Sequence, residues 1–201
     1  MQDFPRRAVL LSLAAGAAAL AGGMRATAHA NSLHGARPTG VELAPLFRLT
    51  THRGEILSRS FVKGRPFIVL FGYTNCPEVC PTALNDLSMH LASLGDDANR
   101  IPVLFVTVDP ERDTPEHLST YLQSFDSRIV GLGGTVDQVT AVAEAFGAPF
   151  RRGETASAGS YNMDHSYMVF MMDRYGLLAR AVGYNEPPQR MADVSKRLLA
   201  Q

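Results

Sequence analysis

Short, uninterrupted apolar runs are the most regular pattern along the chain. Residues 67–71 (FIVLF) and 103–108 (VLFVTV) are rich in β-branched and aromatic side chains. Continuous runs of this kind are typical of strands that are covered on both faces of a sheet. A shorter run at residues 129–130 predicts a further strand. We therefore predict a central sheet whose strands are buried from both sides.

Helical periodicity separates these strands. The first helix is indicated by leucines at three- and four-residue spacing that end at a glycine: Leu84, Leu87, Leu91, Leu94 and Gly95. The sequence DTPE at residues 113–116 predicts the start of a second helix, because it combines a capping side chain, a proline in the first turn and an acid near the positive end of the helix dipole. Further helices are predicted over residues 136–146 and from Pro187 or Pro188 onward.

Two hairpins complete the pattern. Residues 167–172 and 177–182 are apolar runs joined by the polar turn DRYG, which predicts a β-hairpin. Residues 46–49 and 55–57 flank the turn THRG and predict a smaller hairpin near the start of the domain. Strands that alternate with helices and end in a hairpin and a helix indicate an α/β fold. We expect a mixed central sheet flanked by helices, with an N-terminal hairpin extension.

The first 30 residues have the organisation of an export signal. Arg6 and Arg7 precede an uncharged Ala/Leu-rich run over residues 8–23, and the sequence AHA at residues 28–30 supplies the small residues that a signal peptidase reads. The run is 16 residues long, shorter than the roughly 20 residues needed to cross a bilayer. We predict cleavage after Ala30, with retention as an anchor as the alternative. Both Sec and twin-arginine export stay open.

A linker is expected between this signal and the domain. Residues 31–43 are mixed in character and punctuated by glycine and proline. The domain then occupies residues 44–201. We therefore expect an exported, periplasmic protein that is either soluble or attached to the outer face of the cytoplasmic membrane.

Charge excludes some partners. The 19 basic and 19 acidic residues cancel, and the sequence contains no basic blocks interleaved with aromatic residues. We therefore expect no nucleic-acid partner. A phosphate-binding glycine loop and the H-E-x-x-H metalloprotease motif are also absent from the sequence.

The two cysteines are the most informative residues. Cys76 and Cys80 enclose only three residues, so a disulfide between them would stabilise the fold little by loop closure. They lie between a buried strand and a helix whose first secure turn is expected at Pro81. The positive end of that helix favours thiolates, which attack disulfides and bind metals. A pair of soft thiolates suits Cu(I), whereas a structural zinc site needs four ligands.

Histidine is the expected type of third ligand. His165 lies immediately before a buried strand, where a loop meets the sheet, and the other five histidines lie in the signal, the linker, a turn or helices: His29, His34, His52, His90 and His117. A histidine at such a place is more often structural than ligating. Asp164 is a possible hydrogen-bond acceptor for the ring, and Met163 is an alternative soft ligand.

The sequence resembles the Sco/SenC family of copper proteins. The resemblance rests on FGYTNCPEVCP, VTVDPERDTPEHL and YNMDHSYMVFMMDRYG, which occur in the family's order between about Leu43 and the C-terminus. It implies a thioredoxin-like fold with an inserted hairpin, and copper bound by Cys76, Cys80 and His165. Glu78 and Asn75 depart from residues common in the family's motif, and neither is an implied ligand.

The resemblance also implies a function. Family members help to assemble the dicopper (CuA) site of cytochrome c oxidase, so we expect a copper chaperone and not an enzyme. Its cofactor would be copper, as Cu(I) with Cu(II) left open, and its partner a copper-accepting subunit of a membrane-bound respiratory oxidase. The alternative is a thiol-disulfide oxidoreductase, with Cys76 and Cys80 as a redox-active pair that keeps a partner's copper-binding cysteines reduced. A peroxidase-like or copper-sensing role is a third possibility.

Two further features have competing interpretations. Asp109 is either a group near the copper or on a docking rim, or, together with Arg112, a turn former that caps the following helix; the second interpretation is favoured. Met171 and Met172 alternate along a strand, so at least one of them is expected to fill the core.

Overall fold

The computed structural model describes residues 43–155, 161–183 and 186–201. The described helices are four α-helices, α1 (Val79–Leu94), α2 (Pro115–Leu122), α3 (Val136–Ala145) and α4 (Pro188–Leu199), and three 3₁₀ helices, η1 (Pro45–Arg48), η2 (Arg59–Phe61) and η3 (Gly95–Arg100). The described strands are β1 (Thr50–Thr51), β2 (Phe67–Gly72), β3 (Val103–Thr107), β4 (Ile129–Gly133), β5 (Arg151–Thr155), β6 (Tyr161–Asp164), β7 (Met168–Met172) and β8 (Leu178–Gly183).

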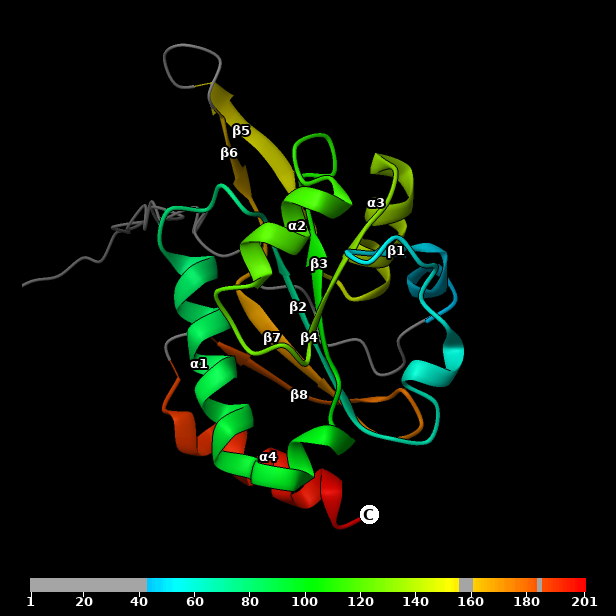
Figure 1. Cartoon of the computed structure of the whole chain (residues 1–201), viewed down its shortest axis with the longest axis vertical. Coiled ribbons are helices and arrows are strands. Elements are labelled where there is room, and N and C mark those ends of the chain that lie inside the picture. The colour runs from blue at the N-terminus through cyan, green and yellow to red at the C-terminus, as the bar shows by residue number, and fades with distance from the viewer. Residues whose placement is uncertain (1–42, 156–160, 184–185) are drawn as a thin grey trace, which may run out of the picture. The chain divides into compact units, whose positions relative to one another are not determined.

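Six of these strands form one mixed sheet (Figure 1) in the order β1-β4-β3-β2-β7-β8. β2, β3 and β4 are parallel neighbours, while β7 runs antiparallel to β2 and β8 antiparallel to β7. The order places β2 at the centre, with β3 on one side and β7 on the other. The loop after β2, the loop after β3 and the connection before β7 therefore lie near one another at the carboxyl end of β2.

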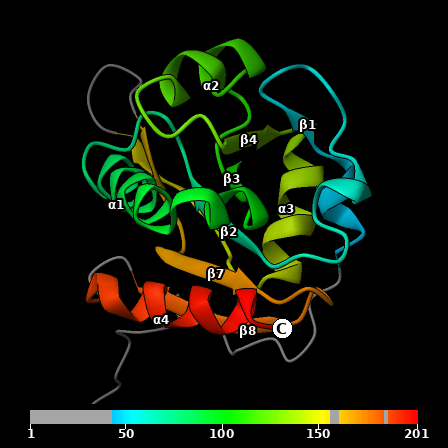
Figure 2. The ribbon, with the colours of Figure 1, turned by 60° about the horizontal axis from the view of Figure 1, so that its bottom comes forward.

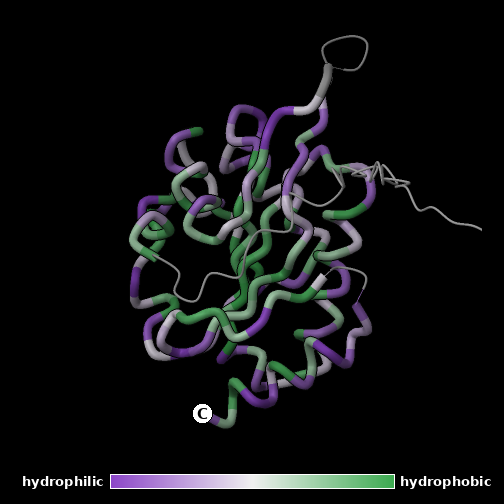
Figure 3. The backbone as a smooth tube through the Cα atoms, turned by 180° about the vertical axis from the view of Figure 1, so that it is seen from behind, coloured by the Kyte–Doolittle hydropathy of each residue, from purple (hydrophilic) through white to green (hydrophobic). Residues whose placement is uncertain are grey.

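The core lies on both faces of this sheet. Successive residues of a strand face opposite sides, so Ile68 and Leu70 pack under α1, α2 and α4, whereas Val69 and Phe71 pack under α3 and η1. Figure 2 shows α1 and α3 on opposite sides of the sheet. The hydropathy colouring in Figure 3 places the apolar positions along the central strands. This confirms the predicted mixed sheet with helices on both faces.

The N-terminal hairpin is only partly as predicted. Residues 45–48 form a 3₁₀ helix instead of a strand, because Pro45 at its start fixes φ and supplies no N–H for a ladder. The predicted turn is present, with Gly54 at φ +84° and the Thr51 N–H donating to the Glu55 carbonyl at 2.7 Å. A single bridge between Thr50 and Ile56 joins the two arms.

The pair β5–β6 is a separate two-stranded sheet that the hydropathy pattern did not predict, although the family resemblance implied an inserted hairpin. β5 offers no apolar alternation, since Arg151 and Arg152 are exposed. β6 does alternate, with Tyr161 and Met163 buried on one face, but its four residues are too short a pattern to interpret without a partner strand. Met171 and Met172 are both fully buried in the core.

Two predictions about the N-terminal part of the chain, the export signal and the linker over residues 31–42, concern residues that the structure does not describe. Across residues 43–155, 161–183 and 186–201, the helices are too short or too polar to cross a bilayer.

Candidate metal centre

The two cysteines lie at the junction between the central strand and the first helix. β2 ends at Gly72, and Cys76 follows in the loop, while Cys80 is the second residue of α1. The helix therefore begins two residues earlier than the predicted Pro81. Both side chains are buried, 9% and 2% exposed, and the Cys80 N–H points to the Cys76 sulfur at 3.4 Å. Both are free thiols.

His165 reaches the cysteines from the segment before β7, the strand that neighbours β2. It lies in the short connection between β6 and β7, and β7 pairs with β2 from Phe67 to Leu70. This pairing brings residue 165 beside the loop that follows β2. The imidazole is 2% exposed and packs edge-on against the rings of Tyr73 and Tyr167, at centroid distances of 5.7 and 4.9 Å.

The orientation of the ring suits metal ligation. Nδ1 of His165 lies 2.8 Å from the Ser166 carbonyl oxygen, which can only accept, so Nδ1 carries the hydrogen. Nε2 then faces the sulfurs, 3.7 Å from Cys80 Sγ. A neutral ring held in this way has its lone pair on Nε2, as a ligating histidine requires.

The dimensions of the cluster fit a three-coordinate metal. The sulfurs of Cys76 and Cys80 and a ring nitrogen of His165 all lie within 4.8 Å of one another. At metal–sulfur and metal–nitrogen lengths of about 2.3 and 2.1 Å, ligands 120° apart are separated by about 3.8 Å. Two soft sulfurs, one imidazole and no carboxylate form a donor set that suits Cu(I). Among the described residues, this is the one cluster of Cys, His and acidic side chains with such geometry.

The two thiols have opposite electrostatic environments. The hydrogen bond from the Cys80 side chain lowers the pKa of Cys76 to about 4, with a smaller contribution from the Cys80 N–H, although burial opposes the shift. The same hydrogen bond, burial and the neighbouring Cys76 charge raise the pKa of Cys80. One proton is therefore shared by the pair and held on Cys80. Metal binding to both sulfurs would displace that proton.

Asp113 holds the cysteine loop against the sheet. Its carboxylate accepts hydrogen bonds from the Thr74 N–H at 3.0 Å, the Thr74 hydroxyl at 2.6 Å and the Thr107 hydroxyl at 2.6 Å. Asp113 is 2% exposed. A buried carboxylate with three donors fixes the loop two residues before Cys76, because each bond would be costly to leave unmade. The sequence DTPE predicted a capping side chain, and Thr114 is that cap. The role of Asp113 in holding the cysteine loop was not predicted.

Asp109 connects the loop between β3 and α2 to the β5–β6 hairpin. Its carboxylate pairs with Arg112 and accepts a hydrogen bond from the Tyr161 hydroxyl at 2.8 Å. The Arg112 guanidinium also stacks on the Tyr161 ring at 3.6 Å. Asp109 forms the predicted turn as well, since its carbonyl accepts the N–H of Arg112 and Asp113. The interpretation of Asp109 as a turn former is therefore confirmed, but the cap of α2 is Thr114, so the capping part of that interpretation is wrong. Asp109 is not a member of the cluster of Cys76, Cys80 and His165.

The other described histidines and acids that were candidates lie outside the three-residue cluster, whereas Met163 shares a buried core cluster with Cys76 and Cys80. Asp164 pairs with Arg151 at 2.9 Å, and the His165 ring bonds instead to Ser166, so Asp164 is not the ring's acceptor. The His52 ring accepts the Gly131 N–H, and His117 is exposed beside Thr74 and Arg112. His29 and His34 lie outside the described residues. Met163 is buried in the core on β6.

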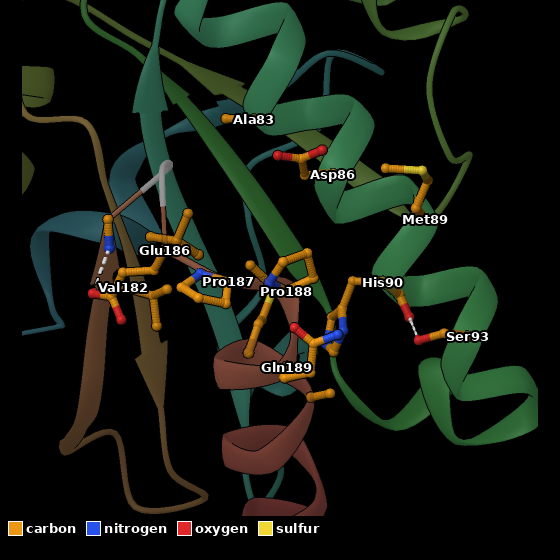
Figure 4. A pocket seen from close by; sticks show the side chains of 14 residues that line it. Ala83, Asp86, Met89, His90, Ser93, Val182, Glu186, Pro187, Pro188 and Gln189 are labelled. Atoms are coloured by element: carbon orange, nitrogen blue, oxygen red, sulfur yellow. Dashed lines mark hydrogen bonds between the residues drawn. The ribbon is translucent and has the colours of Figure 1, made fainter.

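His90 lines a pocket that is separate from the cysteines. This pocket, of about 410 Å³, lies between α1 and the segment that leads into α4 (Figure 4). Nε2 of His90 lies 2.9 Å from the Ser195 hydroxyl, and burial lowers the pKa of the ring. His90 is therefore a neutral residue that joins the two helices, and none of the three cluster residues lines the pocket.

Gly72 makes room for one of the sulfurs. A Cβ at this position would lie 2.8 Å from Cys80 Sγ and 2.6 Å from the Phe105 ring, closer than side chains approach. The glycine at the end of β2 is thus required by the close approach of α1 to the strand. The sequence showed a glycine there, but only the packing shows why.

The fold and cluster together define a thioredoxin-like protein with two cysteines at the first helix and a histidine from the later part of the chain. The SCO1/SenC family model matches residues 36–200. The chain belongs to the SCO1/SenC family, and the resemblance seen in its motifs is confirmed.

Three relatives illustrate the likeness. The chain is 35% identical to Protein SCO2, mitochondrial, of Saccharomyces cerevisiae, over 81% of the chain and 53% of the yeast protein. A structure of Bradyrhizobium japonicum ScoI with copper bound is 36% identical with a TM-score of 0.70, over 76% of this chain and 96% of that one. The crystal structure of yeast Sco1 with copper bound is 30% identical with a TM-score of 0.72, over 82% and 90%. The chain spans 53–59% of the first curated relatives it matches.

Proposed function

We propose that this protein is a copper chaperone that binds Cu(I) through Cys76, Cys80 and His165. The observation that carries the proposal is the convergence of two sulfurs and one imidazole nitrogen within 4.8 Å. The donor set is soft and three-coordinate, which favours Cu(I) over zinc and over oxygen-seeking cations. Two structures similar to this chain were solved with copper bound, which supports the assignment.

The arrangement suits transfer of the metal by ligand exchange. Three ligands leave a direction of approach for a partner's ligands. Cys76 is the more exposed of the two cysteines, at 9% against 2%, and the ring of Tyr167 beside His165 is 41% exposed. An incoming ligand would meet this side first. Exchange with a partner's disulfide would oxidise the two thiolates to a disulfide and reduce the partner's bond to two thiols, which removes two ligands and releases the ion.

We propose a copper-accepting subunit of a respiratory oxidase as the recipient, at its dicopper site. Family membership and the sequence motifs support this choice. The protein would act outside the cytoplasm, as the export signal predicts, either soluble or attached to the outer face of the cytoplasmic membrane. It would be a metallochaperone and not an enzyme with substrate turnover.

A second function is favoured by the electrostatics of the thiols. A thiol with its pKa lowered to about 4 beside one with a raised pKa is the arrangement of a nucleophile and a resolving cysteine. Cys76 would attack a partner's disulfide and Cys80 would complete the exchange. The partner's disulfide becomes two thiols as Cys76 and Cys80 become one disulfide. In this alternative, the protein keeps a partner's copper-binding cysteines reduced.

His165→Ala distinguishes the two functions. Loss of the imidazole should lower Cu(I) affinity by more than the roughly 10–100-fold that loss of an outer-shell partner costs. The Cys76–Cys80 disulfide should still form and reduce reversibly, because thiol exchange does not need the ring. Competition titration with a Cu(I) chelator measures the first property, and thiol counting across a redox buffer series measures the second.

His117→Ala is the matched control, because His117 is an exposed ring near the cysteine loop but outside the cluster. It should keep the affinity of the parent protein. Unchanged Cu(I) affinity in His165→Ala would reject the ligand assignment and leave the thiol-exchange function.

A further inference from the structure

Arginines gather at the end of the sheet that is farthest from the cysteines. Two adjoining hollows, of about 260 and 220 Å³, share Arg65 and Asn99 in their walls. We call this region the arginine end and define it by the five arginines that line the hollows: Arg53, Arg65, Arg100, Arg128 and Arg174. Within the described part of the chain, no Asp or Glu lines either hollow. The balanced charge of the whole sequence conceals this asymmetry.

Three of the five arginines have no acidic partner among the described residues. Arg100 and Arg128 pair with Asp97 and Asp126, whereas no carboxylate of a described residue lies within 4.0 Å of Arg53, Arg65 or Arg174. Arg65 donates to the Phe61 carbonyl and stacks on the Phe61 ring, and Arg174 lies over Tyr175. These contacts orient the two guanidinium groups, and the Asp173 carboxylate beside Arg174 accepts the N–H groups of Tyr175 and Leu177. Further cations are exposed next to the lining residues, at Lys63, Lys196 and Arg197.

The topology explains why these residues meet. Arg65 and Pro66 directly precede β2, Pro102 precedes β3, and Arg128 precedes β4. Because the three strands are parallel, the segments before them all lie at the amino end of the sheet. The cysteine loop follows the opposite end of β2. A six-residue strand spans roughly 20 Å, so the arginine end and the metal centre face in opposite directions along the strands.

The chain also enters the domain at the arginine end. A Cβ on Gly176, in the turn between β7 and β8, would lie 2.5 Å from the Leu43 side chain, so Leu43 packs against this turn. Arg174 belongs to the same turn and lines one hollow. Leu43, the first described residue, therefore lies at the same turn as Arg174. Tyr175 and Leu177 in this turn are 77% and 48% exposed.

We propose that the arginine end is a docking surface for a membrane that contains anionic phospholipids. Arginine forks match phosphate oxygens, and clustered cations attract the anionic headgroups of a membrane surface. An exposed tyrosine and leucine in the same turn suit the interface between headgroups and acyl chains. Docking in this orientation would turn the Cys76, Cys80 and His165 cluster away from the lipid, toward the aqueous side where a membrane protein's outer domain stands. The surface does not depend on the proposed copper function.

Vesicle binding by the full-length protein tests the proposal. Sedimentation with vesicles of phosphatidylcholine alone measures the contribution of apolar segments, and vesicles of equal parts phosphatidylglycerol and phosphatidylcholine add the anionic headgroups. We expect stronger binding to the mixed vesicles, weakening as salt screens the charges. The triple variant Arg53→Gln, Arg65→Gln, Arg174→Gln should lose roughly 100-fold of the affinity for mixed vesicles, at about fivefold per cation.

The control removes the same amount of charge elsewhere. The triple variant Arg151→Gln, Arg152→Gln, Arg190→Gln changes arginines that line neither hollow and should bind mixed vesicles as the parent does. Thermal unfolding of both variants checks that they are folded. Equal binding of the parent to both vesicle types, or equal losses in the two variants, would overturn the proposal. So would saturation of the arginine end by inorganic phosphate with no preference for anionic vesicles, because that result would identify a free-anion site.

Discussion

Replacing Asp113 with alanine is expected to destabilise the folded protein by about 2–5 kcal/mol. The carboxylate accepts hydrogen bonds from the Thr107 hydroxyl and from both the backbone and the hydroxyl of Thr74. Without it, the buried Thr107 hydroxyl and the Thr74 N–H lose their acceptor, and each such group costs about 1–3 kcal/mol. Urea denaturation of the reduced, metal-free protein measures the change in the free energy of unfolding.

The same substitution should also weaken Cu(I) binding. Thr74 is two residues from Cys76, so releasing Thr74 frees the loop that positions one sulfur. We expect a loss of about 10–100-fold in affinity, as for other groups that orient a ligand. Asp193→Ala, which removes an exposed carboxylate from α4, should change stability by less than about 0.5 kcal/mol and leave the affinity as it was. Equal effects of the two substitutions would show that Asp113 has no special role.

Gly72→Ala should disturb the sulfur of Cys80 directly. The added methyl group would lie 2.8 Å from Cys80 Sγ and 2.6 Å from Phe105 Cε2, and Phe105 is fully buried. Overpacking of this kind costs about 1–3 kcal/mol. The sulfur must move away from its place beside Nε2 of His165, so Cu(I) affinity should fall together with stability. The two quantities are measured by chelator competition and by urea denaturation.

Gly133→Ala provides the comparison for this variant. Gly133 lies in β4 of the same sheet, and a Cβ there would come no closer than 3.4 Å to Thr107 Cγ2, which is an ordinary contact. We expect a change in stability within about 1 kcal/mol and no change in affinity. If Gly72→Ala kept the parent's Cu(I) affinity, Cys80 Sγ would not be held by the strand as described.

Local patterns predicted most of the fold. The runs at β2 and β3 are apolar at nearly every position because both faces of the sheet are covered, and α1 carries its leucines on the face that it buries. One failure lies where a short segment takes its conformation from another segment, since β5 is a polar strand that exists only as the partner of β6. The other failure is local, because Pro45 starts a 3₁₀ helix where a strand was predicted.

The site depends still more on distant contacts. Their spacing in the sequence brings Cys76 and Cys80 together, but the helix end does not make both of them thiolates, because the pKa of Cys80 is raised. His165 reaches the two cysteines only through the pairing of β7 with β2. Its position before a buried strand singled it out among six histidines, and the family resemblance implied that it is a ligand. Asp113 lies 39 residues from the Thr74 that it holds, and Gly72 is needed because of a helix packed beside it. None of these relations leaves a periodic signal in the sequence.

X-ray absorption of the reduced protein loaded with one Cu(I) counts the sulfur and nitrogen ligands that the copper has in solution. We expect two sulfurs and one imidazole nitrogen in the parent protein, with the imidazole contribution lost in His165→Ala. A shell of sulfur alone, or an imidazole signal that survives in His165→Ala, would contradict this ligand assignment.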